Sequence, residues 1–456
     1  MGNTIALVSL SIWPILVILF LSKFGFVLGV LFSVLLSYLF LPVGYDFNFK
    51  GFPVLDKGTI TILTIILYMF FKGKYFDFSD FGFKSKLVIF FIILSPLLTT
   101  LSNFEPYMHL RGMSFYDGVS MAVSNLLIIA PFFIALKFFR TYESHVQLFK
   151  YFLIIMTIYS VLIIFEIRFS PQLHRIIYGY HPHEFVQQIR SGGYRAVVFV
   201  GHGLLVALLV SIALLVSASL YKLQVKVLGC NSLYFVFFYM ILLFLSKSYA
   251  AFFYGFLGVI VILFFKSKLI ILISGFFALL FILYPALSIL NMFPHEAIVS
   301  IASNFSVERA QSLNFRFYHE SNLLAHAFEK FWTGWGSWGR NRVYDPITFS
   351  DLSVTDGRWI ITFGMRGLIG FFVEYYFLIV TISSNLFLIR YSGQIENKEL
   401  LLCSFHSLIV CFILIDQIPN ASLGYFYWFF AGCLFARVSH VLKEVKNKRI
   451  KDLMNK

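Results

Sequence analysis

Long apolar runs constrain this chain more than any other feature of its sequence. Residues 5–21, 24–41 and 196–220 carry hardly a charge, and each run is close to or above the ~20 residues that cross the hydrocarbon core of a bilayer. Only 13% of all residues are charged, whereas a soluble domain carries about 25%. The sequence therefore predicts an all-α integral membrane protein.

The expected spans form one polytopic domain over residues 1–456. No removable signal peptide is expected, because only Asn3 and Thr4 precede the first apolar run and no positive segment stands before it. About 12–13 membrane helices are predicted, near 4–21, 24–41, 58–71, 87–101, 119–136, 151–167, 196–220, 232–246, 250–265, 269–290, 359–389, 400–415 and 421–436.

Topology explains the net charge of +14 better than nucleic-acid binding does. Lysine and arginine concentrate in alternate short loops and in the tail 437–456, whereas the opposite short loops carry only Lys50, Lys57, Arg111 and Lys247. This asymmetry predicts a cytoplasmic C-terminal tail. The four cysteines show no disulfide pattern, and we interpret them as small apolar side chains.

Two loops are longer than the others, a smaller one at 169–195 and a larger one at 291–357. Four predicted crossings separate them, so both are expected on the non-cytoplasmic face. Apolar residues in the larger loop recur at helical steps and predict an amphipathic helix over about 312–332: Leu313, Phe317, Leu324, Phe328 and Phe331. That helix is expected to end at the glycine- and tryptophan-rich stretch 334–339.

Arginine in these loops is the strongest chemical signal. Guanidinium groups suit phosphate oxygens through paired hydrogen bonds. Headgroup contact explains any single arginine equally well, but the set on one face favours an anionic ligand. The arginines concerned are Arg190, Arg195, Arg309, Arg316, Arg340, Arg342 and Arg358, and His202 is placed two turns inside the span after Arg195.

Ionisable residues inside predicted spans usually face a bundle interior or a polar cavity. These residues are Glu166, His202, Arg366, Glu374 and His406. For Glu166 and Glu374 we favour a structural ion pair, for instance with Arg366. No metal site is predicted, because His181, His183 and Glu184 have neither a helical HExxH spacing nor a cysteine cluster beside them.

With these motifs in place, the chain resembles the superfamily of O-antigen ligases and O-antigen (polysaccharide) polymerases. The motifs are Arg195 at a helix mouth, Arg316 in "NFRFYHESNLLAHAFEKF", the turn "GWGSWGR", and Gly367 at the start of a span in "DGRWIITFGMRGLIGF". The family's His-Asn pair falls on Asp356 and Gly357, so this chain carries Asp-Gly instead. The resemblance covers residues 190–375 by motif and the remainder by hydropathy.

The resemblance implies a metal- and cofactor-independent glycosyltransferase of the bacterial inner membrane, active at the periplasmic face in polysaccharide or lipopolysaccharide biosynthesis. Its donor would be a glycan on undecaprenyl diphosphate, and its partners a glycan acceptor, the lipid bilayer and other polysaccharide-assembly membrane proteins, with no nucleic acid. Polymerase is the first hypothesis and ligase, with lipid A core or another acceptor, the second. A lipid-linked-oligosaccharide flippase or transporter is a third, disfavoured because no paired halves with matching broken helices are evident.

Site roles follow from the resemblance and from chemistry. Arg195 and Arg316 are expected to hold the diphosphate, with auxiliary contacts from Arg340, Arg342, Arg358 and His202. Trp335 and Trp338 are expected to stack on sugar rings. Asp356 is the expected catalytic base, with His319 and Glu320 as the next candidates. The alternative for Asp356 is a helix cap, since Thr355-Asp356-Gly357 precedes an apolar run.

Overall fold

A computed structural model describes residues 2–49, 53–76, 78, 81–190, 192–304 and 306–454. The side chains of Arg190 and Arg309 lie outside the described part. The elements, in chain order, are α1 Thr4–Phe40, α2 Lys57–Phe71, α3 Phe83–Leu101, α4 Phe115–Phe138, α5 Tyr142–Phe169, α6 Leu173–Tyr178, η1 Phe185–Gln188, β1 Ile189–Arg190, β2 Gly193–Tyr194, α7 Gly203–Lys222, α8 Leu233–Leu245, α9 Tyr249–Phe264, α10 Ser267–Ile289, α11 His295–Ser303, α12 Val307–Phe328, α13 Arg358–Arg390, α14 Asn397–Ile415 and α15 Tyr425–Met454.

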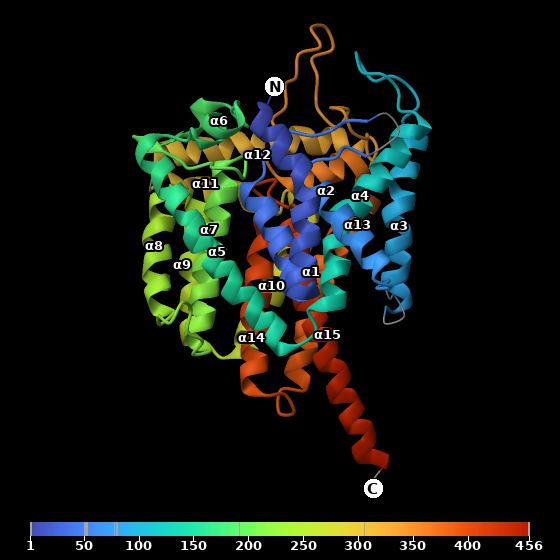
Figure 1. Cartoon of the computed structure of the whole chain (residues 1–456). Helices are drawn as coiled ribbons and strands as arrows, with labels where there is room; N and C mark the ends of the chain where they lie inside the picture. The colour runs from blue at the N-terminus through green and yellow to red at the C-terminus, as the bar shows by residue number, and fades with distance from the viewer. Residues whose placement is uncertain are drawn as a thin grey trace.

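The protein is an α-helical bundle of the multi-pass membrane type. Over the described residues, eight helices are long and apolar enough to cross a membrane, and three shorter apolar helices accompany them. The only strands in this part of the chain are the two-residue pair β1 and β2. Helix α6 of the smaller loop and helices α11 and α12 of the larger loop lie at one end of the bundle, whereas α15 extends beyond the other end (Figure 1). The N-terminus lies at the loop end, where the Asn3 backbone N–H donates to the Tyr178 carbonyl at 3.0 Å.

Helix α1 is a hairpin of two helical arms. The chain reverses direction at Gly25, whose φ is 72°. Glycine adopts such a positive φ readily because it has no Cβ. Beyond the turn, a Cβ placed on Gly29 would lie only 2.7 Å from the Leu21 Cα, and Phe20 and Phe32 have ring centroids 6.4 Å apart. These contacts require antiparallel arms, which agrees with the two predicted spans at 4–21 and 24–41.

The span predicted at 359–389 is not one continuous helix, which corrects the sequence interpretation. Arg358 Nε lies 2.9 Å from Glu374 Oε1, although a straight helix would separate residues sixteen apart by about 24 Å. The chain bends back at Gly367, whose φ is 63° and ψ −167°. A short first arm therefore packs beside the start of a long second arm.

The glycine-rich stretch of the larger loop docks on this break. Trp335 N–H donates to the Gly364 carbonyl at 2.8 Å, and Leu368 N–H donates to the Phe331 carbonyl at 2.8 Å. A Cβ on Gly334 would lie 2.4 Å from the Arg366 backbone nitrogen, so the two backbones pass with no room for a side chain. Backbone groups released by the break thus find partners in the loop, as buried backbone requires.

The span predicted from residue 196 begins later, at Gly203, because residues 196–200 form buried non-helical backbone. Glu166 Oε2 accepts from the Val197 and Val198 N–H groups, each at 2.7 Å. Lys57 Nζ donates to the Phe199 carbonyl at 3.0 Å. Irregular backbone in a membrane protein needs such internal partners, so Glu166 holds this segment through backbone hydrogen bonds. Within the part of the chain that the structure describes, the ion pair expected for Glu166 is not present.

The tail predicted from residue 437 is the continuation of a helix. α15 runs from Tyr425 to Met454, and Arg437 is buried where its Nε donates to Glu399 Oε1 at 2.6 Å. The first residue of the tail therefore belongs to the packed bundle, and the basic residues after it extend along the projecting part of α15 (Figure 1).

Candidate active site

A cavity of about 170 Å³ lies at the loop end of the bundle, between α10, α11, α12, the start of α13 and the segment 416–424. Most of its wall is apolar, with contributions from Phe293, Ile298, Leu313, Phe317, Leu323, Ile360 and Ile418. Three charged side chains also line it, namely Arg316, Glu320 and Asp356. An apolar hollow with a few convergent polar groups is the usual form of a ligand site.

Helix α12 supplies the wall because its sequence is amphipathic. It starts at Val307, earlier than the predicted 312, and ends at Phe328. Leu313, Phe317 and Leu323 face the cavity together with Arg316 and Glu320. The two charged residues are four positions apart and therefore lie on one face of the helix.

Arg316 and Asp356 form an ion pair, with Arg316 Nε 3.1 Å from Asp356 Oδ2. The side chains are 31% and 40% exposed. A half-exposed pair of this kind contributes at most about 1 kcal/mol. The guanidinium can therefore exchange its carboxylate partner for another anion at little cost.

Asp356 does not cap helix α13, so the helix-cap alternative was wrong. The N-cap residue is Gly357, with no side-chain cap hydrogen bond. Instead, the first N–H groups of the helix donate to carbonyls of the 416–424 segment: Arg358 N–H to Asn420 at 3.0 Å and Trp359 N–H to Gln417 at 3.2 Å. The Asp356 carboxylate is thus left to its ion pair with Arg316.

Glu320 is the more deeply set carboxylate. Tyr284 Oη donates to its Oε1 at 2.7 Å and Trp359 Nε1 to its Oε2 at 3.2 Å, with Ser288 Oγ at 3.3 Å from Oε1. Burial raises the pKa of the Glu320 carboxyl from 4.5 to about 7, although these three hydrogen bonds lower it. A carboxylate with a pKa near neutrality is suited to accept and return a proton.

The segment 416–424 was not among the predicted site residues, although it forms part of the wall. Pro419 and Ile418 line the cavity. Asp416 holds the segment in shape by accepting from Asn420 Nδ2 at 2.8 Å and Ser422 Oγ at 2.7 Å. The sequence does contain a signal for this segment, namely the polar stretch "DQIPNAS" between two apolar spans. A connection of this length between two spans does not by itself require an aspartate, a glutamine and an asparagine.

His319 is not among the residues lining the cavity. Its ring lies against Phe315, with centroids 4.3 Å apart, and beside Tyr318. The structure therefore separates His319 from Glu320, its neighbour in sequence, and favours Glu320 of the two.

Arg195 and His202 lie in a different part of the loop end. Arg195 is buried, donates through Nη2 to the Lys247 carbonyl at 3.1 Å, and packs against Gly203 at the start of α7. His202 is the N-cap of α7, where its Nδ1 accepts from Leu204 N–H at 3.1 Å, so it was wrongly placed two turns inside a span. None of the described residues of the smaller loop lines the cavity that contains Arg316.

Arg340 and Arg342 have structural partners. Arg340 is buried and donates to the carbonyls of Trp335, Arg111 and Glu105 at 3.1, 2.8 and 3.0 Å. Arg342 pairs with Asp351 at the base of an exposed loop. Arg340 has most of its donors committed to backbone oxygens, so a diphosphate contact expected of it is not supported.

Arg358 and Arg366 both pair with the buried Glu374, at 2.9 and 3.0 Å. Thr362 Oγ1 also donates to Glu374, at 3.0 Å. Residues 358, 362 and 366 follow at steps of four, so one face of the short arm of α13 is fastened to the long arm. The structural ion pair favoured for Glu374 is confirmed, and Arg358 belongs to it.

The two tryptophans differ in accessibility. Trp335 is buried, stacks on His326 with centroids 4.3 Å apart, and donates from Nε1 to the His326 carbonyl at 2.8 Å. Trp338 is 55% exposed, with the Arg111 guanidinium over its ring. Trp335 therefore holds the loop together, and neither tryptophan lines the cavity that contains Arg316.

Comparison with known proteins gives no family for this chain. No protein-family model matches the sequence, and no characterised protein is significantly similar to it. In the described part of the chain, no three His, Cys, Asp or Glu side chains gather closely enough to hold a metal ion.

Proposed function

We propose that this protein is a membrane glycosyltransferase that polymerises a surface polysaccharide, moving a growing glycan from undecaprenyl diphosphate to a lipid-linked repeat unit. The observation that supports the proposal most strongly is one cavity at the end of a membrane bundle that joins Arg316, Asp356 and Glu320 within a mostly apolar wall. The family resemblance of the motifs between residues 190 and 375 supports the same activity.

The apolar wall suits a donor that carries both a lipid and a charge. Phe293, Leu313 and Ile360 offer surface to the first isoprene units, and Arg316 offers paired donors to the diphosphate. The Arg316–Asp356 pair, with Nε and Oδ2 3.1 Å apart, would open as the phosphate oxygens replace the carboxylate. In the absence of the donor, Asp356 would hold the Arg316 guanidinium in position through this ion pair.

The reaction requires two changes of charge. An acceptor sugar hydroxyl attacks the anomeric carbon, the bond from that carbon to the diphosphate oxygen breaks, and the hydroxyl proton leaves to a base. Arg316 stabilises the negative charge that grows on the departing diphosphate. Glu320, whose pKa is about 7, accepts the proton. We thus assign the base to Glu320 and give Asp356, the first candidate from sequence, the positioning role.

In this proposal the protein lies in a bacterial inner membrane, with the loop end in the periplasm and α15 reaching into the cytoplasm. The basic residues along α15 support that orientation. The acceptor and other membrane proteins of polysaccharide assembly are its expected partners, since the substrates arrive on lipid carriers.

Deletion of the gene, followed by gel resolution of the surface glycan, tests the proposal. A polymerase predicts loss of the ladder, with one repeat unit kept on its acceptor. A polymer that accumulates on the polyprenyl carrier would indicate a ligase instead. Repeat units that fail to reach the periplasm would indicate a flippase, and an unchanged ladder would contradict all three.

A further inference from the structure

A small cavity of about 10 Å³ lies among α3, α4, α13 and α15. Arg358 and Arg366 of the short arm of α13 line it, whereas Ile360 of the same arm lines the proposed active site. Residues two positions apart point to nearly opposite sides of a helix. The short arm therefore separates this cavity from the proposed active site.

Two guanidinium groups share one carboxylate at this cavity. Arg358 Nε lies 2.9 Å from Glu374 Oε1, and Arg366 Nη1 lies 3.0 Å from Glu374 Oε2. The arginine side chains are 25% and 14% exposed and the glutamate 6%, so all three are largely withdrawn from water. Glu374 is the only acidic side chain among the described lining residues. Two positive charges and one negative charge thus leave one positive charge without a counter-charge.

The cavity also contains hydrogen-bond donors that lack an acceptor. Asn125 of α4 is 6% exposed, and its side chain makes no hydrogen bond to any residue that the structure describes. Trp428 Nε1 of α15 is buried and likewise has no hydrogen-bond partner within the described ranges. Both residues line the cavity. Because a buried polar group without a partner costs stability, these donors favour a ligand that accepts hydrogen bonds.

The size and the surroundings of the cavity restrict the ligand. A volume of about 10 Å³ is room for roughly one particle of the size of a water molecule, and a tetrahedral oxyanion is larger than that. The rest of the wall is apolar, with Ile92, Ile129 and Val373. An uncompensated charge is costly in such surroundings. A monatomic anion supplies the counter-charge in the smallest volume.

We propose that this cavity binds one chloride ion, held by Arg358, Arg366 and Asn125. The ion neutralises the excess positive charge and accepts hydrogen bonds from the guanidinium groups and from the Asn125 amide. It thereby joins the short arm of α13 to α4, just as Glu374 joins that arm to the long arm. The inference does not depend on the transfer activity proposed above.

Thermal unfolding of the purified full-length protein in detergent tests the proposal. When sodium chloride or sodium bromide replaces sodium gluconate at constant ionic strength, Tm should rise with halide concentration and then level off, as binding to the folded state requires. Inorganic phosphate should not substitute for the halide. A Tm that follows ionic strength alone, or that rises more with phosphate than with chloride, would overturn the proposal.

Two substitutions of Asn125 sharpen the test. Asn125→Leu removes the amide donors at nearly constant volume, so it should weaken halide binding on the order of tenfold. In gluconate this variant should be at least as stable as the parent, because it also removes a buried polar group that lacks a partner. Asn125→Asp supplies a negative charge at the cavity and should abolish the rise of Tm with halide. A parental halide response in either variant would contradict the proposal.

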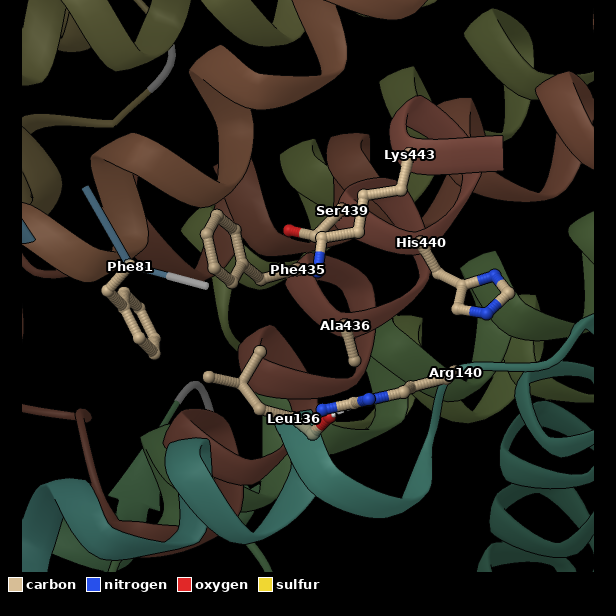
Figure 2. A pocket seen from close by; sticks show the side chains of 8 residues that line it. All are labelled: Phe81, Leu136, Arg140, Phe435, Ala436, Ser439, His440 and Lys443. Carbon is tan, nitrogen blue, oxygen red and sulfur yellow. Dashed lines mark hydrogen bonds between the residues drawn. The ribbon is translucent and has the colours of Figure 1, made fainter. Parts of the chain in front are cut away.

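Arg140→Gln is the matched control. Arg140 lines a separate cavity, where it faces the side chains of α15 (Figure 2). Along α4, Asn125 is about 20 Å from Phe138, the last residue of the helix before Arg140. The control should therefore keep the parental rise of Tm with halide. Loss of that rise in Arg140→Gln together with its persistence in Asn125→Leu would place the halide in the other cavity and overturn the proposal.

Discussion

Arg316 of α12 and Asp356, just before α13, meet across the proposed active site with Nε and Oδ2 3.1 Å apart. The contact joins the middle of the amphipathic helix to the point where the larger loop returns to the bundle. Because both side chains are partly exposed, the pair can be opened by a competing anion without a large loss of stability.

Replacement of Arg316 by lysine should reduce glycan transfer by on the order of 10²–10³, nearly as much as replacement by alanine. Lysine keeps the charge but cannot make the paired contacts of a guanidinium. Polymer formation by membranes containing each variant is the measurement. Arg342→Lys is the matched control, since Arg342 pairs with Asp351 outside the cavity, and it should stay near the parent rate. A full ladder from Arg316→Lys would remove Arg316 from the site.

The rate of transfer should rise with pH through about 7, because the Glu320 carboxyl must lose its proton before it can accept another. Glu320→Gln should abolish polymer formation at every pH while donor binding persists. Asp356→Asn should reduce the rate less and keep the pH profile, because Asp356 positions Arg316. The opposite pattern, with an active Glu320→Gln and an inactive Asp356→Asn, would return the base assignment to Asp356.

Glu320 should also make stability depend on pH. Its pKa rises from 4.5 to about 7 in the folded protein, so the folded state binds more protons between these values and its stability falls as pH increases through them. The free energy of unfolding should fall by about 3 kcal/mol as the pH rises from 4.5 to 7, because of the raised pKa of Glu320. Glu320→Gln, which cannot ionise, should therefore raise Tm at pH 8 and change it little at pH 4.5. An equal change of Tm at both pH values would contradict the assignment.

Glu374 should matter for stability and assembly of the bundle. Its removal leaves Arg358 and Arg366 without their shared carboxylate, and breaking a buried ion pair costs about 3–5 kcal/mol. Thermal unfolding in detergent should show Glu374→Ala melting well below the parent protein. Glu444→Ala, which removes an exposed carboxylate, should be close to silent. Comparable melting of the two variants would show that the short arm of α13 is held by other contacts.

Helices were predictable from hydropathy because a bilayer demands apolar stretches of fixed length, and the two arms of α1 were separated correctly at the polar, glycine-containing turn near Gly25. The break at Gly367 was not predicted from hydropathy, because apolar segments flank the pair Arg366 and Gly367 and make the whole stretch resemble one span. Its cause is tertiary, namely the glycine-rich segment that docks on it.

The candidate site was predictable in its residue types but not in its grouping. Arg316, Glu320 and Asp356 were all recognised from the sequence, and the structure joins them in one cavity. Arg195 and Arg340 carry the same side chain but are anchored by backbone carbonyls elsewhere. Which of these arginines lines a cavity depends on tertiary packing, and no local sequence pattern distinguishes Arg316 from Arg195 and Arg340.

The most direct test is reconstitution of the purified protein in proteoliposomes with a repeat unit linked to undecaprenyl diphosphate as its only substrate. The account predicts lipid-linked glycans of increasing length together with release of undecaprenyl diphosphate, and neither product from the Glu320→Gln protein. Repeat units that remain single in the presence of folded parent protein, or chains that lengthen equally with Glu320→Gln, would contradict it.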